Sequence, residues 1–271
     1  MADVPKVVTD FGPIQSLVMD VMGDLGTPDA LLPSGGDPHE FQLRPSQAQM
    51  LAGADLVFWD GPELMPALAD ALTSLAPQAR VVSLLHDSGG RVRLFADGGT
   101  DPHGWLDPVN GILWAGKIAE VLAARDPVHA AVYADNARAL QASIAALDLQ
   151  LMAAMTPLQT KPFVVYHDAL GYFTDHYRLD VAGAIELGDA SGPSAARLAE
   201  IRGLIAGSSA VCVFPEIGRD PKFIAALTGG EPVRTGQPQD FEFIAMAPGR
   251  GQYQAMLQGV ADTITECLNR P

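Results

Sequence analysis

The chain has 271 residues, 48% of them apolar and 18% charged, a composition that indicates a globular protein with one large domain or two ordinary ones. Its net charge of -15 repels nucleic-acid phosphates and attracts cations, so we expect no nucleic-acid partner. No apolar run approaches the roughly 18 residues of a membrane helix, and no signal peptide begins the chain. We therefore expect a soluble protein, either cytosolic or a mature form restarted with a methionine.

Short apolar runs alternate with segments of helical periodicity in the first part of the chain. His39 directly follows a glycine-rich turn at 34–38. A loop at 88–99 that contains several glycines is a candidate lid. The alternation predicts parallel strands joined by helices. The expected elements are strand 6–9, helix 13–22, helix 45–51, strand 54–59, helix 63–75 and strand 80–85.

A helix at 109–124 precedes the longest one, 128–155, which lacks Gly and Pro and could extend for roughly 40 Å. The second half then repeats the plan of strands and helices. We predict an α/β protein with an N-terminal lobe at 1–124, a linking helix at 125–157 and a C-terminal lobe at 158–271. The later elements are strand 163–166, helix 170–177, helix 195–206, strand 210–214, helix 221–227, strand 232–236 and helix 253–268.

Three histidines are candidate ligands for a divalent metal. His39 and His103 each end an Asp-Pro-His triplet, and His167 ends an apolar run. The carboxyl ends of parallel strands are where ligands bind in open sheets, so the three rings are expected in one cleft. Neutral imidazole suits zinc, and three nitrogens with one carboxylate complete a tetrahedron.

Asp240, in the irregular segment 237–251, is the carboxylate we favour as fourth ligand. Glu216 is the alternative, or else a polar residue at the rim. Asp101 and Asp168, like two further aspartates beside the candidate ligands, either orient ligand imidazoles or cap helices. His86 and His129 are expected at the surface, and His176 is expected to be structural. Cys212 and Cys267 lack zinc-knuckle spacing and are either a disulfide or two core thiols.

Several motifs, in this order, resemble those of the zinc-binding solute receptors of bacterial zinc ABC importers, a cluster that also includes manganese receptors and metal-binding adhesin-like lipoproteins. The resemblance spans nearly the whole chain. Its carriers are Gly-Asp-Pro-His-Glu-Phe at 36–41, Arg-Pro-Ser at 44–46, Ala-Asp-Leu-Val at 54–57 with Gly61, Asp-Pro-His-Gly-Trp-Leu-Asp-Pro at 101–108, His-Asp-Ala-Leu-Gly-Tyr-Phe at 167–173, Phe-Pro-Glu at 214–216 and Gly-Gln-Tyr at 251–253.

The resemblance implies two α/β lobes joined by one long rigid helix, with Zn²⁺ held in the cleft between the lobes. It implies His39, His103 and His167 as ligands; the manganese receptors usually have glutamate in the third place. The family's fourth ligand is an aspartate before the final tyrosine. Only Asp240 stands at a comparable distance here, in a different sequence setting. The resemblance also implies a Cys212–Cys267 disulfide.

By the same resemblance the protein is a periplasmic receptor, expected to be a monomer and not an enzyme, that delivers zinc to the membrane permease of an ABC importer. The loop 88–99 lacks the histidine-rich run of many zinc receptors. Metal capture is therefore expected to depend on this loop or on a periplasmic metallochaperone.

The residues leave open that the receptor carries manganese or another divalent metal. They also leave two other functions open. A zinc hydrolase would keep one metal position open for water, and no His-Glu-x-x-His or nucleophile-elbow motif is present. A purely structural metal is less favoured, because a chain of this length can bury its own core.

Overall fold

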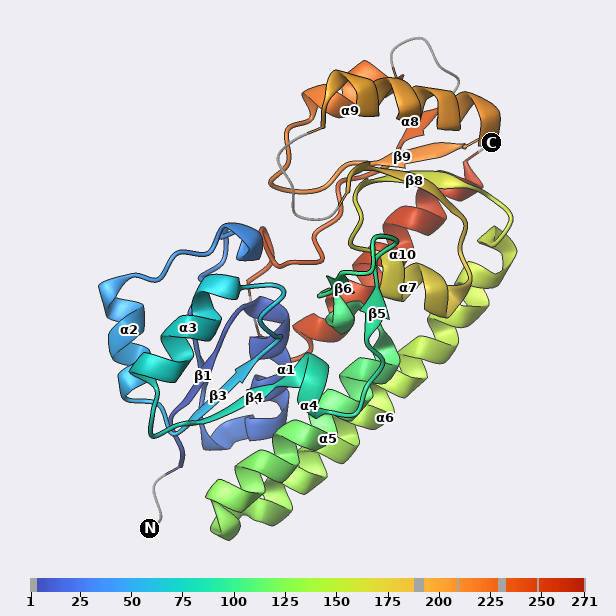
Figure 1. Cartoon of the computed structure of the whole chain (residues 1–271). Helices are drawn as coiled ribbons and strands as arrows, with labels where there is room; N and C mark the ends of the chain where they lie inside the picture. Colours follow the sequence, from blue (N-terminus) through green and yellow to red (C-terminus); the bar gives the residue numbers. More distant parts are fainter. Residues whose placement is uncertain (1–3, 188–192, 209, 229–232, 248, 271) are drawn as a thin grey trace. The chain divides into compact units, whose positions relative to one another are not determined.

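The computed structural model describes residues 4–187, 193–208, 210–228, 233–247 and 249–270 (Figure 1). The chain divides into two compact units. The first unit contains residues 1–147 and 242–255, and the second contains 148–241 and 256–271. Each unit is therefore built from two separate stretches of chain. The unit boundaries cut through α6 and α10, so these two helices pass from one unit into the other.

The helices and strands have the following bounds: β1 Val7–Thr9, α1 Gly12–Met22, β2 Asp29–Ala30, α2 Pro45–Ala52, β3 Leu56–Trp59, α3 Pro66–Leu75, β4 Arg80–Ser83, α4 Leu84–Asp87, β5 Arg93–Leu94, β6 Thr100–Asp101, α5 Pro108–Arg125, α6 Ala130–Met155, β7 Phe163–His167, α7 Gly171–Tyr177, β8 Val181–Glu186, α8 Ala195–Ser208, β9 Cys212–Phe214, α9 Lys222–Thr228, β10 Arg234–Thr235 and α10 Gln252–Asn269.

The first unit contains a four-stranded sheet in the order β2-β1-β3-β4, with every pair parallel. All residues of β1 and β3 are buried, as expected of central strands whose two faces are both covered. Helices α1 and α5 pack on each other beside the sheet, and α5 runs next to α6 (Figure 1). The carboxyl ends of β1 and β3 lead directly into the buried residues Asp10 and Asp60.

The second unit contains a parallel sheet in the order β10-β9-β7-β8. Val164 and Tyr166 of β7 belong to a core shared with α8 and α9, which cover one face of this sheet (Figure 1). Strand side chains alternate between faces, so His167 lies on the opposite face, where α7 and α10 are found. A disulfide joins Cys212 of β9 to Cys267 of α10, which confirms the pairing implied by the resemblance.

The two-lobed α/β fold with parallel sheets and one long helix is confirmed, but some elements differ from expectation. β8 lies between the expected helices 170–177 and 195–206, where no strand was predicted, because its Val-Ala-Gly-Ala-Ile-Glu sequence is poor in the usual strand formers. The predicted strand 80–85 ends at Ser83, where α4 begins. The predicted strand 232–236 is reduced to β10, and its first residue lies outside the described part of the chain.

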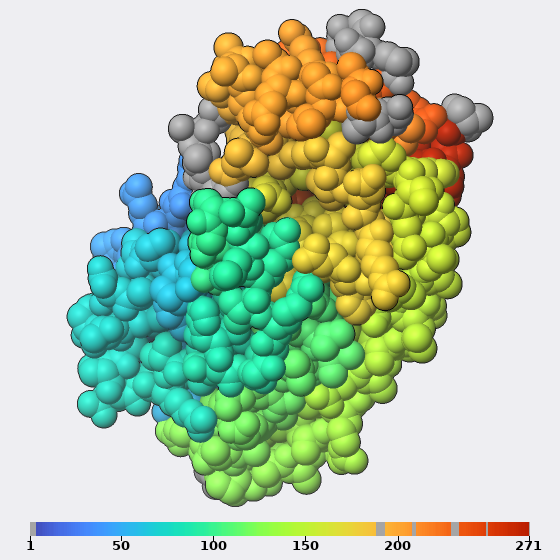
Figure 2. Space-filling view, turned by 45° about the vertical axis from the view of Figure 1, so that its right-hand side comes forward, coloured from blue at the N-terminus to red at the C-terminus, as the bar shows by residue number. Residues whose placement is uncertain are grey.

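The predicted lobe boundaries differ from the two units. Within the described residues the first unit continues past 124 into α6, and it also includes residues 242–255 near the end of the chain. The loop expected at 88–99 contains β5, which pairs antiparallel with β6 as a short hairpin. Most of this segment is exposed, and it forms part of the face drawn in Figure 2, where it is green.

Residues 127–158 are long and apolar enough to count as a candidate membrane span by length and composition, although the sequence led us to expect none. Core helices of proteins without membrane segments meet the same criterion. In α6 the buried residues recur at helical spacing along one face, which is how a helix packs on a protein interior. They are Tyr133, Ala137, Leu140, Ile144, Leu151 and Met155.

Candidate metal centre

The two Asp-Pro-His triplets have one hydrogen bond in common, although His39 lies inside a 3-10 helix (Pro38–Glu40) and His103 precedes another (Gly104–Leu106). The Asp37 carboxylate accepts a hydrogen bond from the His39 backbone N–H at 2.9 Å, and Asp101 accepts one from the His103 N–H at 3.0 Å. Proline between the two residues fixes φ, and the aspartate then closes a tight turn over it. Each triplet therefore holds its histidine backbone in one orientation.

His103 is fully buried, and its ring is oriented by a second bond to the same aspartate. Nδ1 of His103 lies 2.7 Å from Oδ1 of Asp101. Because an ionised carboxylate only accepts hydrogen bonds, Nδ1 carries the proton and Nε2 presents its lone pair. The Trp105 ring lies 5.2 Å from the His103 ring and is itself fully buried, so Trp105 is a core residue that also forms one wall of the site.

Glu242 is the carboxylate that the sequence reasoning missed. It lies 3% exposed in the first unit, next to Phe243, whose φ of 60° is in the left-handed region. A Cβ on Gly12 would stand 2.5 Å from the Phe243 ring, so only glycine at position 12 lets this segment approach α1 so closely. Position 12 therefore fixes where Glu242 lies.

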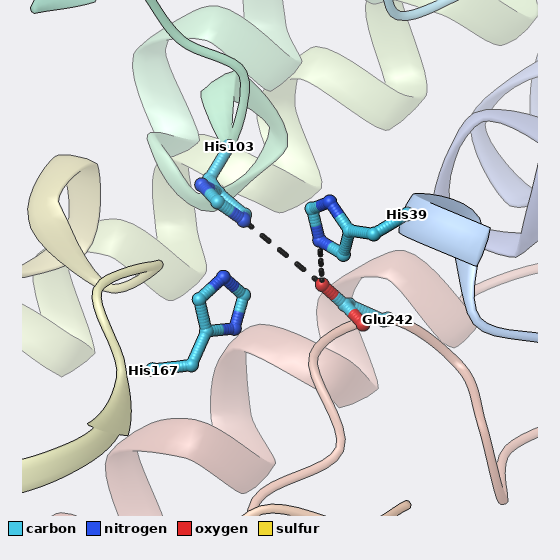
Figure 3. Close-up of side chains that lie close together, drawn as sticks. All are labelled: His39, His103, His167 and Glu242. Carbon is cyan, nitrogen blue, oxygen red and sulfur yellow. Dashed lines mark hydrogen bonds and ion pairs between the residues drawn. The ribbon is translucent and has the colours of Figure 1, made fainter. Parts of the chain in front are cut away.

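The ligand atoms of His39, His103 and Glu242 all lie within 4.8 Å of one another. Oε1 of Glu242 is 2.9 Å from Nε2 of His39 and 4.0 Å from Nε2 of His103 (Figure 3). Ligand atoms at about 2.0–2.1 Å from a tetrahedral zinc ion are roughly 3.3 Å apart. The spacing in this unit therefore suits one small divalent ion.

His167 lies in the second unit, at the carboxyl end of β7, and is 1% exposed. Its Nδ1 is 3.3 Å from Oε2 of Glu216, whose Oε1 accepts a hydrogen bond from Nε of Arg219 at 3.4 Å. Because the Glu216 carboxylate accepts the hydrogen bond at Nδ1, the His167 proton lies on Nδ1, and Nε2 presents the lone pair. Glu216 thus orients an imidazole in this unit, as Asp101 does in the first unit. Orienting an imidazole was one of the two roles expected of Asp101 and Asp168.

The other predicted residues are placed as follows. Asp240 lies in the second unit, next to the bridge between Glu216 and Gln239, and is not a member of the candidate ligand group. Its role as a ligand stays a prediction. The Asp168 backbone N–H donates to the Glu186 carbonyl at the sheet edge. Glu242 could have been found, because it is the only other acidic residue in the irregular segment 237–251.

The three remaining histidines each contact a carboxylate outside the candidate group. Nε2 of His86 lies 2.9 Å from Glu63, and Nδ1 of His129 lies 2.7 Å from Asp126, with both imidazoles partly exposed. Nε2 of His176 lies 2.8 Å from Asp148 and its ring packs edge-on against Tyr177. These contacts agree with the surface positions expected for His86 and His129 and with the structural role expected for His176.

Groups around Asp101 keep this carboxylate, which orients His103, ionised. Burial alone raises the pKa of Asp101, but the His103 ring and Arg93 together bring that pKa below its usual range. In the second unit, burial raises the pKa of Glu186 despite the nearby Arg219. Imidazole nitrogens and one carboxylate are ligands that zinc accepts.

Comparison with known proteins gives a family match over residues 7–267, to the family described as ZnuA, zinc-uptake complex component A, periplasmic. A relative from Paracoccus denitrificans (strain Pd 1222), the high-affinity zinc uptake system protein ZnuA, is 47% identical, with 98% of this chain and 93% of that protein covered. The protein of the same name from Brucella suis biovar 1 is 30% identical, with 97% and 92% covered.

A solved structure, the periplasmic zinc binding protein TroA from Treponema pallidum, matches this chain with a TM-score of 0.86. The two are 24% identical, and the match covers 98% of this chain and 99% of TroA. At that identity the likeness shows the shared fold.

Proposed function

The chain belongs to the ZnuA family, the periplasmic component A of zinc-uptake complexes, and on that premise we propose that it binds Zn²⁺ in the periplasm and delivers it to the membrane permease of an ABC importer. The observation that carries the proposal is the group of His39, His103 and Glu242, three buried or nearly buried ligands gathered within 4.8 Å. The net charge of -15 agrees with a cationic cargo.

His167 is the fourth ligand in this proposal. It offers one imidazole nitrogen, its ring is oriented by Glu216, and it ends a parallel strand, the position at which open sheets bind ligands. Three imidazoles and one carboxylate then close a tetrahedral shell around zinc.

Glu242 takes the place we first expected for Asp240. The two residues are separated by one position, but Glu242 has its carboxylate 2.9 Å from His39 and 4.0 Å from His103. Glu242→Gln is therefore expected to weaken zinc binding far more than Asp240→Asn does. A titration in which Asp240→Asn shows the larger loss would restore Asp240 as the ligand.

A receptor and a hydrolase differ in the fourth metal position. A catalytic zinc site keeps that position for water beside a general base, whereas four protein ligands exclude water and hold the ion as cargo. We therefore propose that the chain is not an enzyme. It acts as a monomer in the periplasm and receives zinc either directly or from a metallochaperone.

Zinc titration of the metal-free protein, followed by calorimetry or competition with a chelator, tests the function. His167→Ala should weaken binding severely, whereas His129→Ala, the matched imidazole outside the group, should bind as wild type does. Zinc should also raise the melting temperature, because it binds only the folded chain. Equal losses in the two variants, or no zinc binding by wild type, would refute the proposal.

A further inference from the structure

In the first unit, the carboxylate that orients His103 is shared with an arginine. Oδ1 of Asp101 lies 2.7 Å from Nδ1 of His103, and Oδ2 accepts a hydrogen bond from Nη1 of Arg93 at 2.8 Å. The Asp101 side chain is 0% exposed and that of Arg93 is 24% exposed. One oxygen of the carboxylate thus serves the imidazole and the other serves a cation.

The second unit repeats the arrangement with different residues. Oε2 of Glu216 accepts a hydrogen bond from Nδ1 of His167, and Oε1 accepts one from Nε of Arg219. Its side chain is 5% exposed, and that of Arg219 is 21% exposed. Each unit therefore contains a chain of the form imidazole, carboxylate, guanidinium.

Local backbone structure places each arginine. Arg93 and Asp101 are direct partners in the β5–β6 hairpin, so the register of two short strands fixes this pair. Arg219 follows Glu216 by three residues, in a turn where its backbone N–H donates to the Glu216 carbonyl at 3.3 Å. Both ion pairs are set by short-range geometry and do not depend on distant packing.

A carboxylate that accepts the Nδ1 proton makes the imidazole a stronger donor to a metal at Nε2. A guanidinium on the other oxygen draws charge away from that carboxylate and also adds a positive charge near the cation. The arginine therefore opposes the effect of the carboxylate. A receptor that must hand its ion on needs such a limit on its affinity.

We propose that Arg93 and Arg219 are positioning residues that lower the zinc affinity of the centre and speed release of the ion, each through the carboxylate that orients a ligand histidine. The inference rests on the proposed function. It goes beyond that function by assigning release to two residues that do not touch the ion.

The test compares Arg93→Met and Arg219→Met with wild type in zinc affinity and in the rate at which a chelator removes zinc. Each variant is expected to bind roughly two- to fivefold more tightly, as a partly exposed ion pair allows, and to release zinc more slowly by a similar factor. The double variant should show the product of the two factors, because the arginines act on different histidines.

Matched controls separate this effect from a general change of charge. Arg91→Met removes the same charge two residues before β5. Arg91 pairs with Asp107, which caps α5, so this variant should leave affinity unchanged. Arg202→Met serves the second unit, since Arg202 donates to the Ala226 carbonyl. Arg93→Lys keeps the charge and should behave as wild type does.

A readout on the metal-free protein does not depend on zinc. The Nδ1 proton signals of His103 and His167 in nitrogen-15 NMR spectra should move downfield in Arg93→Met and Arg219→Met respectively, because the freed carboxylate accepts more strongly. If wild type binds zinc and the two variants bind it equally well or more weakly, this inference is wrong and the proposed function still holds. Tighter binding by Arg91→Met as well would also overturn the inference. A wild type that binds no zinc would refute both the inference and the proposed function.

Discussion

Asp60→Asn is expected to stabilise the metal-free protein at pH 7, by a margin that shrinks on acidification. Asp60 follows β3 and is 0% exposed, and neither of its carboxylate oxygens has a hydrogen-bond partner among the described residues. Asp10, at the equivalent end of β1, is also 0% exposed but accepts hydrogen bonds from the Phe11 and Asp60 backbone N–H groups. The substitution at Asp60 therefore removes a buried acid without removing a hydrogen bond.

Burial raises the pKa of Asp60 well above its usual value of 3.8, and the nearby carboxylates of Asp10, Glu63 and Asp101 raise it further. Burial likewise raises the pKa of Asp10 to about 7. Between the unfolded and folded pKa values the native state binds more protons than the unfolded chain, so stability falls as pH rises. The loss is at most about 1.4 kcal/mol per pH unit for each such carboxyl, which sets an upper limit of about 3 kcal/mol for Asp60 between pH 5 and pH 7.

Urea unfolding of wild type and Asp60→Asn at pH 5 and pH 7 measures this difference, with Asp70→Asn, an exposed aspartate of α3, as the control. The stability gained by Asp60→Asn should be larger at pH 7 than at pH 5, by up to about 3 kcal/mol. Asp70→Asn should show almost no dependence. A gain that is the same at both pH values would show that Asp60 is ionised in the native protein throughout this range.

Three further outcomes are expected. Replacing Cys212 and Cys267 together by alanine should lower the unfolding free energy by about 4 kcal/mol in the chain-entropy model, because the bond closes a loop with a sequence separation of 55; chemical denaturation with unchanged stability would contradict this. Gly12→Ala should displace Phe243 and weaken zinc binding severalfold, whereas Gly203→Ala, in open space, should not; equal affinities in titration would show that Gly12 does not set the site. Zinc affinity should fall below roughly pH 6.5, where imidazole becomes protonated, and a flat profile from pH 7.5 to 5.5 would argue against histidine ligands.

The three histidines could be predicted because each is held by local sequence. Asp-Pro-His fixes His39 and His103 through a proline and an aspartate that are adjacent in the chain, and the apolar run before His167 marks the end of a strand. The alternation of apolar runs and helical segments likewise predicted two parallel α/β lobes. These features depend on neighbours in the sequence.

Glu242 is one of the two acidic residues in 237–251, but no local pattern indicates that it lies beside His39 and His103. Its position depends on Phe243 in a left-handed conformation packed on Gly12, more than two hundred residues earlier. The return of 242–255 to the first unit is equally a property of the tertiary fold. Periodicity contains no information on such contacts, and the segment has no regular structure from which a direction could be read.

Short or weakly patterned strands were the other elements that escaped prediction. β5 and β6 have two residues each, too few for an alternation to be recognised, and β8 is rich in Ala and Gly. The β5–β6 hairpin affects the metal centre, because it places Arg93 against the Asp101 carboxylate. A loop was expected there, so the contact of Arg93 with the carboxylate behind His103 could not be foreseen.

Anomalous X-ray scattering at the zinc absorption edge, from crystals of the zinc-loaded protein, tests the central proposal most directly. We expect one anomalous peak bonded to an imidazole nitrogen of His39, His103 and His167 and to the Glu242 carboxylate, each at about 2.0–2.1 Å. A peak elsewhere, or one in which water or Asp240 replaces Glu242, would contradict it.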